Sequence, residues 1–99
     1  MGLVYLQRYT TEKGTLVACC DEGILGKTFR QGKLKLTVEP RFFGNTVIAL
    51  EEALVILAPA EMMNLAGHEI VSAAVEQGLV HPDAVIQIGG IPHVQVLKM

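Results

Sequence analysis

The placement of strand-like and helix-like patterns constrains the fold most: strand-like segments occupy both ends of the chain and helix-like segments lie between them. Residues 3–9 and 15–20 are apolar segments separated by the turn-prone residues 10–14, which predicts an antiparallel hairpin. The chain closes with residues 84–88 and 91–97 around two glycines, which predicts a second hairpin. Without repeated strand–helix–strand alternation, these patterns favour an α+β fold over a parallel sheet.

A third strand is predicted at residues 33–38, where Lys, Lys and Thr alternate strictly with Leu, Leu and Val. This period of two places apolar side chains on one face and lysines on the other. Asp21 precedes a short turn at residues 22–25 and is predicted to cap it. Residues 42–46 are predicted to form a loop or tight turn that holds aromatic side chains against the core.

The helical region is predicted to begin at residues 51–57 and to be kinked or divided by Pro59, which lacks a backbone donor. The main helix is expected over residues 60–77, ended by Gly78. Its apolar residues recur at spacings of three and four, namely Met63, Ala66, Ile70 and Ala74. The expected structure is one α+β domain over residues 1–99, with a mainly antiparallel sheet and two helices packed on one face in two layers.

Composition bears on partners and location. Charged residues make up 18% of the chain, below the roughly 25% usual for soluble domains, so some apolar surface is expected to be covered by a partner or a second copy, as in a homodimer. The longest apolar run, residues 53–60, is too short to span a membrane, and residues 1–8 lack the basic start of a signal peptide. The protein is therefore expected to be cytoplasmic, with no membrane partner.

The cysteine and histidine spacings do not indicate a metal or another cofactor. Cys19 and Cys20 are adjacent, and strand alternation places them on opposite faces, so both are expected to be free thiols. The histidines are scattered and there is no second cysteine pair. A zinc site is therefore not expected.

Basic and acidic residues are segregated along the chain. Residues 1–50 carry a net charge of +3 and residues 51–99 a net charge of −5. A run without acidic residues contains Lys27, Arg30, Lys33 and Lys35. Such a run favours contact with the phosphates of RNA or another polyanion, and Phe29 could stack on a base. The alternative is a solvated strand face kept basic to prevent edge pairing, with Phe29 in the core.

Other residues indicate a polar pocket. Cys20 precedes a predicted helix start that would lower its pKa, and His93 is the most plausible base for such a nucleophile; the alternative is a buried strand thiol. Asn64, His68 and Ser72 are predicted to share one helix face with Glu61 nearby; the alternative is the wet side of an amphipathic helix.

The most unusual short run is residues 89–93, Gly-Gly-Ile-Pro-His. Its glycines permit close approach of a ligand to backbone amides, and the following strand places His93 and Gln95 on one face; the alternative is a hairpin turn with an incidental histidine. The full set of candidate pocket residues is Cys20, Asn64, Gly89, Gly90, His93 and Gln95.

Four segments carry a family resemblance: residues 20–29, 32–36, 41–44 and 88–95. Their short motifs, in this order, resemble a small archaeal family known as domain of unknown function 424, over most of the chain. The resemblance implies a compact α+β fold in an archaeal cytoplasm, and it implies no activity. Ala49 stands where a helix-capping Asp, Ser or Thr would be expected.

Two functional hypotheses follow, and whether the protein is an enzyme stays open between them. The first is a non-catalytic binding module that contacts RNA or another polyanion through the basic run. The second is a small enzyme or ligand-binding protein with the polar pocket, and an interaction subunit is a third. A continuous basic surface would favour the first hypothesis, and a closed pocket gathering the polar groups would favour the second.

Overall fold

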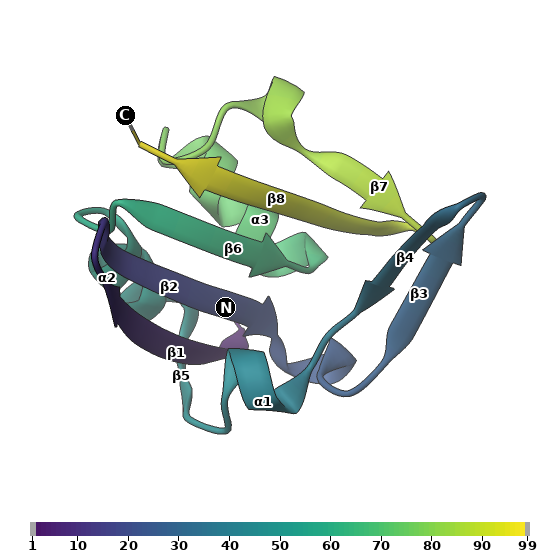
Figure 1. Ribbon diagram of the computed structural model, residues 1–99, viewed down its shortest axis with the longest axis horizontal. Coiled ribbons are helices and arrows are strands. Elements are labelled where there is room, and N and C mark those ends of the chain that lie inside the picture. The colour runs from purple at the N-terminus through teal and green to yellow at the C-terminus, as the bar shows by residue number, and fades with distance from the viewer. Residues whose placement is uncertain (1, 99) are drawn as a thin grey trace.

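The computed structural model describes residues 2–98, and its main feature is a six-stranded sheet in the order β5-β1-β2-β6-β8-β7 (Figure 1). The strands are β1 (Leu3–Thr11), β2 (Gly14–Asp21), β5 (Val47–Ala49), β6 (Met62–Ala66), β7 (Ile86–Ile88) and β8 (Ile91–Leu97). Neighbouring strands are antiparallel except for β2 and β6, which are parallel. The predicted α+β class, the mainly antiparallel sheet and both terminal hairpins are confirmed.

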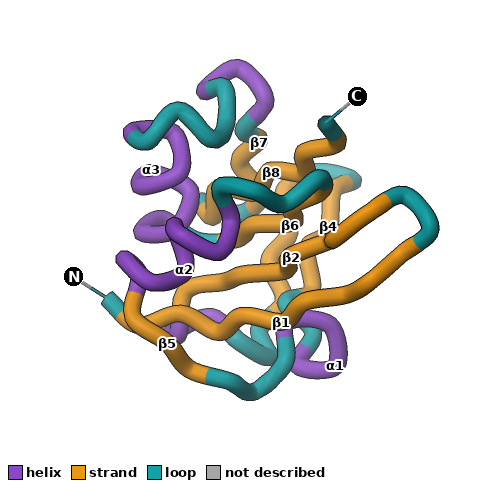
Figure 2. Tube along the Cα trace, turned by 90° about the vertical axis from the view of Figure 1, so that its left-hand side faces the viewer, coloured by secondary structure: helices purple, strands orange, loops and turns teal. Residues whose placement is uncertain are grey.

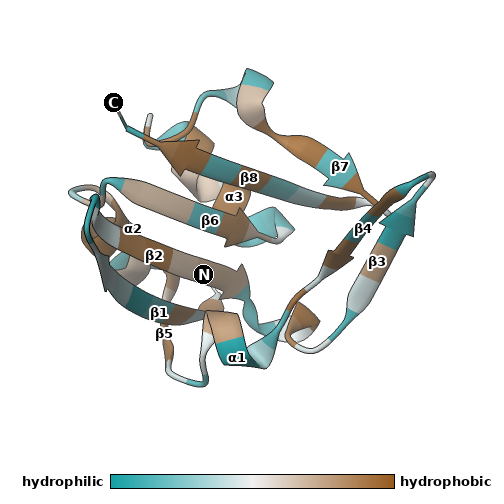
Figure 3. Ribbon diagram, viewed as in Figure 1, coloured by the Kyte–Doolittle hydropathy of each residue, from teal (hydrophilic) through white to brown (hydrophobic). Residues whose placement is uncertain are grey.

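A second, two-stranded sheet stands apart from the first and consists of β3 (Thr28–Gln31) and β4 (Leu34–Thr37). Strand β4 confirms the strand predicted at residues 33–38, but its partner β3 was not predicted. Figure 1 shows this hairpin extending beside the main sheet, with its tip near the turn between β7 and β8. In Figure 3, polar and apolar residues alternate along β4, whereas β3 carries one apolar residue, Phe29, among polar ones.

Helices α2 (Leu50–Leu57) and α3 (His68–Glu76) cover one face of the main sheet, and the short helix α1 (Pro40–Phe43) lies on the other side (Figure 2). Helix α2 follows β5 directly, and Ala49 provides no side-chain cap. The amide of Leu50 instead donates to the carbonyl of Gly2. No helix within residues 2–98 is long and apolar enough to cross a membrane.

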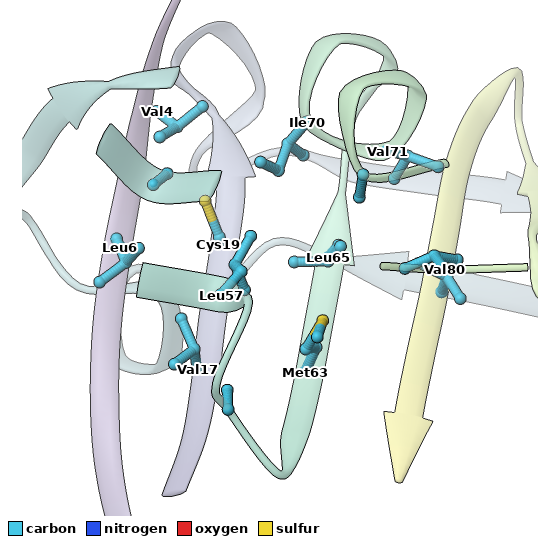
Figure 4. Close-up of a cluster of buried hydrophobic side chains, with 14 of the residues drawn as sticks. Val4, Leu6, Val17, Cys19, Leu57, Met63, Leu65, Ile70, Val71 and Val80 are labelled. Carbon is cyan, nitrogen blue, oxygen red and sulfur yellow. The ribbon is translucent and has the colours of Figure 1, made fainter. Parts of the chain in front are cut away.

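Two hydrophobic clusters lie on opposite faces of the sheet. The first joins α2 and α3 to the sheet through Leu57, Leu65 and Ile70, among others (Figure 4). The second contains Val38 and Phe43, contributed by the segment after β4 and by α1. A two-layer arrangement is therefore not confirmed, because α1 and the β3–β4 hairpin add buried contacts on the face opposite the two larger helices.

The predicted main helix over residues 60–77 is wrong in its first part. Residues Met62–Ala66 form the central strand β6, and the helix begins at His68. A strand buried between neighbours reads as a continuous apolar run, and its periodicity cannot be told from that of a buried helix. Gly67, with φ of +118°, separates the two elements, so Asn64 does not share a helix face with His68 and Ser72.

Asp21 caps a different helix from the one predicted. It makes no side-chain hydrogen bond to the short 3-10 turn Glu22–Ile24 that follows it. Its carboxylate instead accepts from the amides of Glu69 at 2.8 Å and Ile70 at 2.9 Å, in the first turn of α3. A negative charge at a helix N-terminus satisfies otherwise unpaired amides, so Asp21 ties the end of β2 to α3.

Candidate functional site

The β3–β4 hairpin has two chemically different sides. Arg30 and Lys35 lie directly opposite each other in the register, on the same side as Thr28 and Thr37, whose hydroxyl oxygens lie 3.2 Å apart in a hydrogen bond. Thr28, Arg30 and Lys35 on this outer side are exposed, and Thr37 is half-buried. Strand alternation directs them away from the side that packs into the second hydrophobic cluster.

The structure brings together three of the four predicted basic residues. Lys33 lies at the tip of the hairpin, beside Gly32 in a two-residue turn with φ of +60°. Lys27 is exposed at the base of the hairpin and lies outside its ladder, because β3 begins at Thr28. We therefore define the basic face as Arg30, Lys33 and Lys35, together with the two threonines Thr28 and Thr37.

The cations of the basic face have no acidic partner within residues 2–98. In the described part of the chain, no carboxylate oxygen lies within 4.0 Å of a side-chain nitrogen of Arg30, Lys33 or Lys35; the ion pair found there joins His81 and Asp83 at 3.7 Å. Like charges directly opposite on neighbouring strands destabilise a hairpin by roughly 0.2–1 kcal/mol. An anion bound between Arg30 and Lys35 would remove this repulsion.

The glycine turn Gly89–Gly90 supports the hairpin. The amide of Gly89 donates to the side-chain oxygen of Gln31 at 2.9 Å. A methyl group on Gly89 would lie 2.9 Å from the carbonyl oxygen of Arg30 and 3.2 Å from Cβ of Phe29. At this turn the backbone of β3, and not a ligand, lies close to Gly89. Phe29 packs on the inner side of the hairpin, with the second cluster.

Three of the predicted pocket residues meet on the face of the sheet opposite α2 and α3. Asn64 on β6 lies opposite Gln95 on β8, and its side-chain oxygen lies 3.0 Å from Nε2 of His93. An open groove of about 300 Å³ passes over Asn64 and Gln95, with Phe42 on its wall. The groove is a shallow depression on the surface, and Gly89 and Gly90 do not line it.

Cys20 lies on the same face but cannot act with His93. Ala66 lies between them in the register, which puts their backbones two strand spacings, about 10 Å, apart. The prediction of a lowered pKa for Cys20 is wrong, because burial, with a smaller contribution from Asp21, raises the pKa of this thiol to about 12. Cys19 points into the first cluster, and both cysteines are free thiols as predicted.

Sequence reasoning missed the aromatic edge of the groove. The rings of Tyr9 and Phe42 stack with centroids 5.5 Å apart, and the hydroxyl of Tyr9 donates to the carbonyl of Phe42. The first two residues of the loop predicted at residues 42–46 belong instead to α1. The sequence signal for this helix is Pro40 at its first position. Within residues 2–98 no group of three potential metal ligands is found.

The apolar residues expected to indicate a homodimer are spread over several elements. The large exposed ones lie on β1, β4, β5, α2, β7 and β8, and are Leu3, Leu34, Val47, Val55, Ile86 and Leu97. Isolated apolar residues are normal on protein surfaces. A homodimer therefore stays a prediction.

His93 gives the folded protein a testable dependence on pH. Burial lowers the pKa of His93 below its ordinary 6.5, so the unfolded chain binds more protons between the two values. The free energy of unfolding is expected to fall as the pH drops through this window, and to fall less for His93→Gln. Denaturation at pH 7 and pH 5.5, with the exposed His81→Gln as control, measures this; equal pH dependence of both variants and the original protein would contradict it.

The fold and these surfaces define a small α+β domain with a basic hairpin and an open polar sheet face. Residues 9–99 match the model of a family described as protein of unknown function (DUF424); the chain belongs to this family, which confirms the resemblance of its motifs. The chain is also similar to the solved structure of an uncharacterized conserved protein from Methanopyrus kandleri, with a TM-score of 0.73 and 25% identity over 98% of this chain and 94% of that one. The search of curated proteins returned no match.

Proposed function

We propose that this protein is a non-catalytic binding module that contacts RNA or another polyanion through the basic face of the β3–β4 hairpin. The observation that carries the proposal is the cross-strand pair of Arg30 and Lys35, two like charges with no carboxylate near them in the described chain. Such a pair lowers the stability of the free hairpin, and phosphates bound at the pair would offset that cost. Counterion release adds to the affinity.

The distribution of the remaining charge favours an approach of the polyanion from the side of the hairpin. Residues 51–99 carry a net charge of −5, and four of their acidic residues lie on helices α2 (Glu51 and Glu52) and α3 (Glu69 and Glu76). A polyanion is repelled by these elements and attracted by the hairpin, which the first half of the chain provides. Charge asymmetry of this kind orients a ligand before contact.

The test is the salt dependence of binding to a fluorescent RNA. Contacts from Arg30, Lys33 and Lys35 predict that log K falls against log salt with a slope of about −2 to −3. Exchanging Lys33 and Lys35 for glutamine removes two contacts and should reduce the slope to about −1. Both side chains are exposed, and the exchange removes the repulsion between Arg30 and Lys35, so the melting temperature should not fall.

The matched control exchanges Arg8 and Lys13 for glutamine, which changes the net charge equally. Both are exposed residues of the β1–β2 hairpin. This variant should retain the slope of the original protein. No RNA binding at low salt, or equal loss in both double variants, would overturn the proposal.

A second candidate function rests on the groove beside Asn64 and Gln95. Two carboxamides with an aromatic wall suit a small uncharged ligand that hydrogen-bonds through one edge and packs through a flat face. Cys20 is buried and does not line this groove. The second candidate function is therefore ligand binding without a cysteine nucleophile. Gln95→Ala, at an exposed position, should then abolish binding of such a ligand while leaving RNA binding unchanged.

A further inference from the structure

We infer that the ligand of the basic face is the sugar–phosphate backbone of double-stranded nucleic acid, bound without preference for base sequence; this rests on the proposed function. The inference depends on which side chains the hairpin turns outward. Proteins that bind single strands combine cations with aromatic side chains on which bases stack. Proteins that hold a duplex by its backbone use cations, hydroxyls and amides on phosphate and sugar.

Phe29, the aromatic residue of the hairpin, is turned away from the cations. It lies opposite Leu36 in the register, and both belong to the side that packs into the second cluster. The Cβ of Phe29 lies close to Gly89 in the supporting turn. The aromatic ring is thus on the inner side of the ribbon, while Arg30 and Lys35 are on the outer side, and a base could not stack on Phe29 while its phosphate contacts both cations.

The outer side consists of two cross-strand pairs of phosphate-binding groups. The first pair is Arg30 and Lys35, and the second is Thr28 and Thr37, with their hydroxyls already in contact. Cations and hydroxyls bind phosphate oxygens and carry no sequence information directly. Each strand of the hairpin is four residues long, about 13 Å, which spans about four base pairs.

Contacts between β3 and the β7–β8 turn hold the basic face in place, which suits a stiff ligand. Gln31 fixes the tip of β3 to the β7–β8 turn, and the backbone carbonyl of Arg30 packs against Gly89. A duplex presents a stiff backbone with one charge per about 1.7 Å, twice the density of a single strand. A preformed cationic face therefore loses little conformational entropy on binding a duplex, whereas a flexible single strand must be ordered.

The experiment measures, by fluorescence anisotropy, the binding of a labelled duplex of about 12 base pairs and of each of its labelled strands. Unlabelled inorganic polyphosphate is measured as a competitor at equal phosphate concentration. We expect the duplex to bind about tenfold more tightly than either strand or polyphosphate, and a duplex of scrambled sequence to bind equally. Arg30→Gln with Lys35→Gln should remove this preference, whereas Arg8→Gln with Lys13→Gln should retain it.

Equal or tighter binding of a single strand or of polyphosphate would overturn the inference of a duplex ligand and leave polyanion binding by the hairpin intact. A strong preference among duplex sequences would also overturn it. Failure of all the probes to bind at low salt would instead overturn the proposed function itself. The outcomes for the two claims are therefore distinguishable.

Discussion

Replacing Gly67 by alanine is expected to lower the free energy of unfolding by about 4 kcal/mol. Gly67 has φ of +118° and ψ of 154°, a region that is essentially restricted to glycine. An added methyl group would collide with the carboxyl group of Asp21. Asp21 would then have to move, and α3 would lose the two hydrogen bonds that cap its first turn.

Chemical denaturation of Gly67→Ala beside Gly23→Ala measures this effect. Gly23 does not have a positive φ, and a methyl group there meets nothing within 4 Å. The control is therefore expected to unfold with nearly the original free energy. A loss below about 1 kcal/mol for Gly67→Ala would contradict the role of Gly67 and Asp21 as the joint between β2, β6 and α3.

Replacing Gly89 by alanine is expected to lower the free energy of unfolding by about 2–3 kcal/mol and to displace the β3–β4 hairpin. The new methyl group would lie 2.9 Å from the carbonyl oxygen of Arg30, and backbone atoms cannot move aside as a flexible side chain can. The left-handed conformation, with φ of +59°, adds its own cost. The hydrogen bond from Gly89 to Gln31 should weaken as the hairpin shifts.

Gly90→Ala is the matched control within the same turn. Gly90 also has a positive φ, +84°, but a methyl group there meets nothing within 4 Å. It should therefore show only the conformational cost, about 1–2 kcal/mol, with no change in the hairpin. Equal losses for the two variants, together with unshifted amide resonances of Arg30 and Gln31, would contradict the supporting role of this turn.

Most of the elements that could be predicted from the sequence have one exposed and one buried face. Strand β4 alternates between apolar and polar residues, and β1 and β8 alternate in burial. Strand β2 is buried on both faces and could be predicted because the turn-prone residues 10–14 join it to β1. Strand β6 could not be recognised, because Met63, Leu65 and Ala66 are buried and a short strand that is paired on both edges and buried resembles a segment of a buried helix. The partner of Asp21 is almost fifty positions away in the chain, so its local sequence favoured the wrong helix.

In the candidate site, the kinds of residue could be predicted from the sequence, but their pairing across strands could not. The basic run is visible in the sequence, but which cations share a face depends on the pairing of Arg30 with Lys35, and Lys27 lies before the first residue of β3. Likewise, the sequence placed His93 and Gln95 on one face, whereas the contact of His93 with Asn64 required recognising β6 as a strand. Long-range pairing thus decides which of the predicted residues can act together.

The most direct test of polyanion binding by the hairpin is an NMR titration of the isotopically labelled protein with a short nucleic-acid duplex. Binding at the basic face should shift the amide resonances of Thr28, Arg30, Lys33, Lys35 and Thr37, and raising the salt concentration should reverse the shifts. Shifts centred on Asn64, His93 and Gln95, with an unperturbed hairpin, would contradict it and favour a ligand site on the open sheet face.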